Sequence, residues 1–150
     1  MAFYKDGVIS IPNVTGDIVI TATAVAQAPH YTNLADPTSE NWKMNSRVNS
    51  SGTIVENLST QVTNAFQISV GDVIRIKNCG TVTQHVYKSF DTETSESGGV
   101  DFTATSSYDE TTKIVTKTIL TVTKPWARFT LVTADIEGDI IITRNEEIPV

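Results

Sequence analysis

Short runs of β-branched and apolar residues recur along the chain, roughly every 8 to 12 residues, with turn-forming residues between them. This spacing is typical of a β-sandwich or a barrel. In "KIVTKTILTV", residues 113–122, Ile114 and Ile119 do not share one parity, which predicts a bulge or a twist of the strand near Ile119. The pattern predicts strands at residues 7–11, 17–24, 43–49, 53–55, 66–70, 72–77, 83–90, 100–106, 113–122, 127–131 and 139–143.

Composition favours an all-β fold. Valine, isoleucine and threonine make up 54 of the 150 residues, against four leucines, and β-branched side chains fit strands better than helices. Only "VENLSTQVTNAF", residues 55–66, has apolar spacing compatible with a helix, and its serines and threonines favour loop or strand. A chain of this length is most simply one domain, perhaps with an appendage.

One motif is written three times. "VTGDIVIT" at residues 14–21 returns as "IEGDIIIT" at 136–143, and a looser copy, "SVGDVIRI", lies at 69–76. Glycine supplies the positive φ that ends a turn, and aspartate can accept backbone N–H bonds where the next strand starts. The copies are therefore explained locally as three turns that lead into strands. A second interpretation is that two β units each close on such a strand.

The second interpretation predicts the domain organisation. Residues 1–24 would form an N-terminal β-hairpin for anchoring or oligomerisation, residues 25–36 a linker containing a proline, and residues 37–150 the sandwich. An isolated hairpin is marginal in water, so this one should pair with another chain. Its predicted contact residues are Ile9, Ile11, Ile18 and Ile20.

Charge and cysteine content argue against several classes of protein. The net charge is -6 with no cluster of basic residues, so a nucleic-acid partner is not expected. No run approaches about 20 apolar residues, so no membrane span is expected. The single cysteine, Cys79, allows no internal disulfide and is expected to be a small buried apolar residue. The N-terminal "MAFYKDGVIS" lacks a secretion-signal pattern, so none is expected.

Two strand-like segments predict a candidate carbohydrate-binding face. "VIRIKN" places Arg75 on the face opposite Ile74, and "QHVYKSF" places His85 and Tyr87 on one face. If these strands are neighbours, Arg75, His85 and Tyr87 would line a groove suited to a polyol, with a ring for stacking and fixed donors for hydroxyls. The alternative is a solvated face with ordinary cross-strand pairs.

The two tryptophans have two interpretations. Trp42 and Trp126 can be core anchors or platforms for sugars, and buried aromatic residues dominate sandwich interiors. In "WARF", Phe129 pointing inward would leave Trp126 and Arg128 on the opposite face.

Metal and catalytic chemistry have little support. The acidic loop "DTETSESGGVD" contains oxygen ligands that calcium could use, but its spacing matches no EF-hand and a charged loop is usually solvated. With only His30 and His85 available and no G-x-S-x-G motif, no nucleophilic triad can be singled out. We therefore expect a protein that is not an enzyme and has no cofactor and no metal site. The loop carboxylates are Asp91, Glu93, Glu96 and Asp101.

Residues across most of the chain resemble a known group of proteins. "DGVISIPNVTGDIVITATA" is similar to the closing strands of immunoglobulin-like modules in structural proteins of phages that infect Gram-positive bacteria. The segments "TNLADPTSENWKMNSRVNSSG", "VTNAFQISVGDVIRIKN", "KPWARFTLV" and "GDIIITRNEEI" resemble the jelly-roll modules, similar to carbohydrate-binding modules, that follow them in tail, baseplate and head-fibre proteins. The first 24 residues are too few for a whole immunoglobulin-like module.

The resemblance implies an antiparallel jelly-roll β-sandwich in a non-enzymatic virion protein of a phage or prophage, assembled in the host cytoplasm. Its implied partners are other virion proteins, further copies of itself and bacterial cell-wall polysaccharide. The alternatives are a capsid decoration or assembly protein that binds only virion proteins, and, less favoured, a free bacterial polysaccharide-binding module.

Overall fold

The computed structural model describes residues 3–5, 8–10, 15–19, 30–81 and 86–150. Within these ranges it is all-β, with no α-helix and one short 3-10 turn, η2 (Thr133–Asp135). The strands are β1 (Phe3–Lys5), β2 (Val8–Ser10), β3 (Ser46–Val48), β4 (Ile54–Glu56), β5 (Thr60–Val62), β6 (Phe66–Gln67), β7 (Val73–Lys77), β8 (Val86–Phe90), β9 (Thr103–Asp109), β10 (Ile114–Thr121), β11 (Trp126–Val132) and β12 (Ile141–Arg144).

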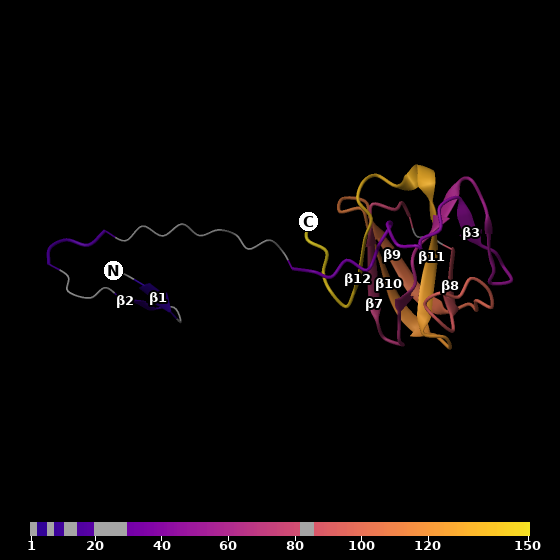
Figure 1. Cartoon of the computed structure of the whole chain (residues 1–150), viewed down its shortest axis with the longest axis horizontal. Coiled ribbons are helices and arrows are strands. Elements are labelled where there is room, and N and C mark those ends of the chain that lie inside the picture. The colour runs from indigo at the N-terminus through magenta and orange to yellow at the C-terminus, as the bar shows by residue number, and fades with distance from the viewer. Residues whose placement is uncertain (1–2, 6–7, 11–14, 20–29, 82–85) are drawn as a thin grey trace.

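Two antiparallel sheets form a sandwich. One sheet has the order β12-β7-β10-β9. In the other, β11 is central: β5 and β6 pair with it, and so does β8. Figure 1 shows the first sheet to the left of β11 and β8, with β3 beyond them to the right. The predicted all-β antiparallel sandwich is confirmed, and its jelly-roll connection pattern stays a prediction.

Strand β11 is buried on both faces. Ala127, Phe129 and Leu131 point into the main core between the sheets. Arg128 and Thr130 point to the opposite face, where Thr130 Oγ1 accepts a 3.0 Å bond from the N–H of Val48 in β3. The β3–β4 ribbon thus covers the second face of this sheet. The predicted alternation of "WARF" is confirmed.

The main core is aliphatic and aromatic. Phe129 packs between Phe66, whose ring centroid is 5.7 Å away, and Phe102, at 6.1 Å. Trp42 is buried in this core and donates through Nε1 to Gln61 Oε1 at 2.8 Å, so its core interpretation is confirmed. In β10 the pairing with β9 shifts between Ile119 and Thr121, which confirms the predicted irregularity.

The second and third copies of the Gly-Asp motif pair with each other. They form β7 and β12, with Ile142 opposite Ile76. Gly71 has φ +90°, and Asp72 accepts the N–H of Ser69 at 2.8 Å. The turn chemistry expected for the motif is therefore present at this copy.

The N-terminal hairpin uses different residues from those predicted. Strand β1 pairs with β2, with Tyr4 opposite Ile9. Residues 17–19 are not in a strand, and Ile18 is exposed, so the pairing expected between residues 7–11 and 17–24 is wrong in its described part. Ile11 and Ile20 lie outside the described residues. Because β2 pairs with β1, the first Gly-Asp copy has no partner strand among the described residues.

The sandwich begins earlier than predicted. Leu34 and Ala35, assigned to the linker, pack on the main core. The N–H of Leu34 donates to Ile142 O at 2.7 Å, and Thr32 N donates to Glu146 Oε2 at 2.6 Å. The boundary at residue 37 is therefore wrong, because residues 32–36 cover the outer edge of β12. No bond in the described part of the chain joins residues 3–19 to the sandwich, and the β1–β2 hairpin stands apart from it in Figure 1.

The buried side chain of Arg128 holds together three segments that surround the second sheet, which is the sheet built around β11. Its side chain is 0% exposed. Nη1 donates to the carbonyls of Asn41 at 2.6 Å and Thr63 at 3.3 Å, and Nη2 donates to that of Glu93 at 2.9 Å. These carbonyls belong to the segments before β3, after β5 and after β8. One guanidinium therefore joins three loops across the central strand.

We expect Arg128→Ala to lower the free energy of unfolding by about 3 to 5 kcal/mol, because buried carbonyls lose their donor and a cavity remains. Chemical denaturation measures the change. Arg47→Ala is the matched control, since Arg47 is exposed on β3 and should change stability by no more than about 0.5 kcal/mol. Equal losses for both variants would contradict this role of Arg128.

Candidate functional site

The structure does not bring Arg75 and Tyr87 into one groove. Arg75 is on β7 and points to the outer face of the first sheet, away from the buried Ile74 and Ile76. Tyr87 is on β8 in the other sheet, and its ring packs in the sandwich interior, 4.5 Å from that of Phe102. The groove prediction is wrong because the chain crosses between sheets after β7. His85 lies outside the described residues.

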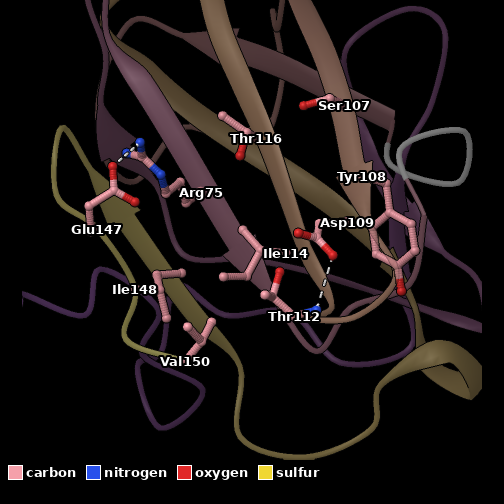
Figure 2. Close-up of a pocket in the computed structure, with 10 residues that line it drawn as sticks. All are labelled: Arg75, Ser107, Tyr108, Asp109, Thr112, Ile114, Thr116, Glu147, Ile148 and Val150. Atoms are coloured by element: carbon pink, nitrogen blue, oxygen red, sulfur yellow. Dashed lines mark hydrogen bonds and ion pairs between the residues drawn. The ribbon is translucent and has the colours of Figure 1, made fainter.

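Arg75 instead lines a hollow on the outer face of the first sheet. The hollow has a volume of about 340 Å³. Figure 2 shows Arg75 and Glu147 joined on one side of it and Tyr108 and Asp109 on the other, with Ile114 of β10 between the two sides. The lining residues are Arg75, Ser107, Tyr108, Asp109, Thr112, Ile114, Thr116, Glu147, Ile148 and Val150.

The hollow combines one cation, carboxylates and hydroxyls. Arg75 Nη2 donates to Glu147 Oε1 at 2.5 Å, and Nη1 donates to Glu146 O at 3.1 Å. The hydroxyls of Ser107 and Thr116 bond to no other described residue. Such a set of fixed donors and acceptors beside aliphatic side chains suits a polar, hydroxyl-rich ligand.

The C-terminal segment builds one wall of this hollow. Ile148 is 4% exposed, and Thr143 Oγ1 donates to Glu146 O at 2.8 Å. Lys77 Nζ donates to Pro149 O at 3.3 Å. Sequence reasoning identified Arg75 but missed this wall, since "NEEIPV" carries no strand or turn pattern that would bring it back over the sheet.

A second hollow lies beside Trp126. Its volume is about 410 Å³. Trp126 is half-buried and packs against the small cluster of Val48, Val62 and Phe90, so it contributes both to packing and to the surface. Arg144 Nη1 donates to Gln67 O at 2.6 Å along the rim. This hollow is lined by the aromatic residues Phe66 and Trp126, whereas Tyr108 is the aromatic residue that lines the Arg75 hollow.

Three carboxylates of the acidic loop form ion pairs with lysines. Lys124 Nζ lies 2.7 Å from Asp91 Oδ2, and Lys88 Nζ lies 2.7 Å from Asp101 Oδ1. Glu96 pairs with Lys43 at 2.5 Å. Within the described residues no group of three or more histidine, cysteine, aspartate or glutamate side chains could hold a metal ion.

Cys79 has the environment of a core residue. It is buried, and burial raises the pKa of its thiol to about 12. A thiol with that pKa stays protonated near neutral pH, whereas nucleophilic chemistry requires the thiolate. The described part of the chain also contains no helix long and apolar enough to cross a membrane.

Lys117 is a charged residue in the sandwich interior, which the sequence pattern did not indicate. It shares the inward face of β10 with Val115 and Ile119 and is 1% exposed. Its Nζ donates to Ser106 Oγ at 2.8 Å and lies 4.7 Å from the centroid of the Tyr87 ring. Burial lowers the pKa of this amine from 10.5 to about 8.

This pKa difference predicts a pH dependence of stability. Between pH 8 and 10.5 the unfolded chain keeps the Lys117 proton that the folded chain has lost, so stability should rise with pH across this window. Below pH 8 both states are protonated and the folded state carries the full desolvation cost, about 3 kcal/mol at most. Lys117→Met should therefore raise the free energy of unfolding at pH 7.

Denaturation curves at several pH values test this expectation. Cys79 acts in the opposite direction above pH 9, because the unfolded thiol ionises first. The comparison of wild type with Lys117→Met removes that contribution, and Cys79→Ala measures it separately. A wild-type and variant difference that stays constant from pH 7 to 10.5 would contradict the buried amine.

The chain was compared with protein-family models, curated proteins and solved structures, and nothing matches significantly in any of the three comparisons.

Proposed function

We propose that this chain is a non-enzymatic structural protein of a phage or prophage virion, which attaches to the particle through its N-terminal segment. The proposal is carried by one observation: the sandwich has its own core, and the described N-terminal residues form no bonds to it. The core draws on residues from Leu34 onward. Residues 15–19 are exposed and bond to no other described residue.

The N-terminal segment has the physical properties of an attachment element. Its β1–β2 hairpin has three residues in each strand, and a two-stranded hairpin alone is marginally stable in water. Ile18 is 49% exposed and Val19 is 87% exposed. Apolar strand-forming residues left in solvent gain stability when they pair with another sheet.

The Arg75 hollow supports polysaccharide binding as the second part of the proposal. Its volume lies at the lower end of the range for small-molecule sites, enough for a sugar unit. The cation, the carboxylates and the free hydroxyls match a ligand with many hydroxyl groups. A rigid sheet presents them, because β7, β9 and β10 are paired along their lengths.

A decoration protein that binds only virion proteins is the alternative function. One observation favours it: the guanidinium of Arg75 already bonds to Glu147 and to the Glu146 carbonyl, so a glycan would have to compete for it. The two functions share the N-terminal attachment and differ only in the sandwich.

Deleting residues 1–25 tests the attachment. The truncated chain should keep its melting temperature within about 2 °C, since none of the described residues in this segment bonds to the sandwich. It should no longer cosediment with virions that lack this protein, whereas the full chain should. Unfolding of the truncated chain, or undiminished cosedimentation, would contradict the proposal.

Arg75→Ala tests the hollow. We expect it to weaken binding to purified host cell-wall polysaccharide by roughly ten- to a hundred-fold, the loss of charged hydrogen bonds worth about 1.5 to 3 kcal/mol. Isothermal titration calorimetry measures the affinity. Arg144→Ala is the matched control, because Arg144 lines the Trp126 hollow.

Together, the Arg75→Ala and Arg144→Ala measurements distinguish three possibilities for polysaccharide binding. Loss only with Arg75→Ala supports the proposed site. Loss only with Arg144→Ala moves the site to the Trp126 hollow. Absence of binding by the wild type across host envelopes favours the decoration function.

A further inference from the structure

Strand β9 is an open edge of the first sheet. It pairs with β10 along one side, and within the described residues its other side makes no backbone hydrogen bond. Alternate residues of an edge strand direct their N–H and C=O groups outward. Over the seven residues of β9 this leaves a ladder of unpaired groups.

Other edges of the sandwich are at least partly covered. At β12, Leu34 N donates to Ile142 O at 2.7 Å, and Ile142 N donates to Asn33 Oδ1 at 2.9 Å. At β5, Lys43 and Val62 exchange two bonds of 2.9 Å, and at β8 Ser89 exchanges two of 2.9 Å with Val100. Strand β9 therefore differs from β12, β5 and β8, which also lie at the margins of the two sheets.

The sequence of β9 lacks the residues that usually prevent an exposed edge strand from pairing with another strand. Exposed edges are usually protected by lysine, proline, a bulge or inward-pointing charge. "TATSSYD" has no lysine and no proline, and its one charge, Asp109, is at the end. Ala104 and Tyr108 point inward against the core and are only half-buried, so the flank of the core is open beside them.

The described part of the first Gly-Asp copy, residues 15–19, belongs to no strand. The other two copies form β7 and β12 of this same sheet, where Ile142 and Ile76 lie opposite each other and both are buried. The sheet thus already accommodates strands of this sequence. In the first copy Ile18 and Val19 are exposed, and no described residue outside residues 15–19 bonds to them.

We propose that residues 17–21 of a second copy of this chain add to the free edge of β9. This inference rests on the proposed function, because it identifies the sheet edge to which the N-terminal segment would pair. Ile18 and Ile20 have the same parity, so both can face inward beside Ala104 and Tyr108 while Val19 faces outward. The added strand then closes the open flank of the core.

The position of the chain favours a second copy over the same molecule. Residues 32–34 enter the sandwich at β12, and β7 and β10 separate that edge from β9. A strand donated within one molecule would have to cross the whole sheet. Two copies that exchange strands reciprocally form a closed dimer with two-fold symmetry.

Sedimentation velocity of the full-length chain over a range of concentrations tests the association. Wild type should form a dimer, and Ile18→Asp should raise the dissociation constant at least ten-fold, because it places a charge against the core. Val19→Asp is the matched control, an adjacent residue facing outward, and should dimerise as the wild type does. A wild type that stays monomeric, or equal effects of both variants, would overturn the inference.

Cysteine cross-linking tests whether the N-terminal segment of one copy lies beside β9 of another copy. Ile18→Cys mixed with Ala104→Cys or Ser106→Cys should give a disulfide-linked pair, which can form only between copies, and Val19→Cys should not. Native Cys79 is buried and is present in every variant, so any cross-linking that it gives is the same background in all samples. Absence of the mixed pair, or cross-linking only when both cysteines are in one molecule, would overturn the second copy as the occupant.

Particle binding separates this inference from the proposed function. If Ile18→Asp still dimerises while deletion of residues 1–25 abolishes cosedimentation with virions, the inference fails and the proposed function stands. If Ile18→Asp is monomeric while the truncated chain still joins virions, the inference stands and N-terminal attachment fails.

Discussion

The buried guanidinium of Arg128 is the constraint on which the second sheet depends. A fully buried cation is unfavourable unless its donors are satisfied. Here three carbonyls from three loops, at Asn41, Thr63 and Glu93, accept from Nη1 and Nη2, whereas the buried Nε has no hydrogen-bond partner among the described residues. The loops must therefore close over β11, and burial lowers the pKa of Arg128 while Glu96 and Glu93 act against that shift.

This constraint explains why the sandwich has a third layer. Because Arg128 and Thr130 occupy the face of β11 that turns away from the main core, that face cannot be left to solvent as in a simple two-sheet sandwich. The β3–β4 ribbon covers it, and Val48 joins Val62 and Phe90 in a small second core. Each of the three loops that Arg128 binds is thereby held in one position relative to the central strand.

Because the core of the sandwich is closed in this way, the surfaces available for binding are its outer faces and its open edge. The outer face of the first sheet carries the Arg75 hollow, whose ion pair with Glu147 brings the C-terminal segment over the strands. The edge at β9 is unpaired within the described residues, and the first Gly-Asp copy has no partner strand there. Ligand binding and assembly would thus use surfaces that the core does not require.

Sequence reasoning succeeded where a strand has one buried face and a clear alternation. The face of Phe129 and the irregularity near Ile119 followed from side-chain parity alone. It failed where the outcome depends on which strands are neighbours: Arg75 and Tyr87 have the expected local alternation, but their strands belong to different sheets. Lys117 was missed because a lysine at an inward position is indistinguishable by pattern from one on a solvated face.

The same limit applies to the irregular segments. For the threonine-rich stretch that contains β5, the sequence favours loop or strand without predicting a definite strand, although Val62 is one of the buried residues of the second core. Leu34 and Ala35 looked like linker because short segments that cover a sheet edge have no period of their own. Tertiary contacts decided both cases.

Native-state amide hydrogen exchange of the full-length chain tests the central claim, that a complete sandwich carries an N-terminal apolar segment and a sheet edge, neither of which has a partner. In a dilute sample, the account predicts strong protection of the amides of β7, β10 and β11, fast exchange at residues 15–19, and fast exchange of the outward amides of β9. Protection of residues 15–19 as strong as that of β11 in the dilute monomer would contradict it.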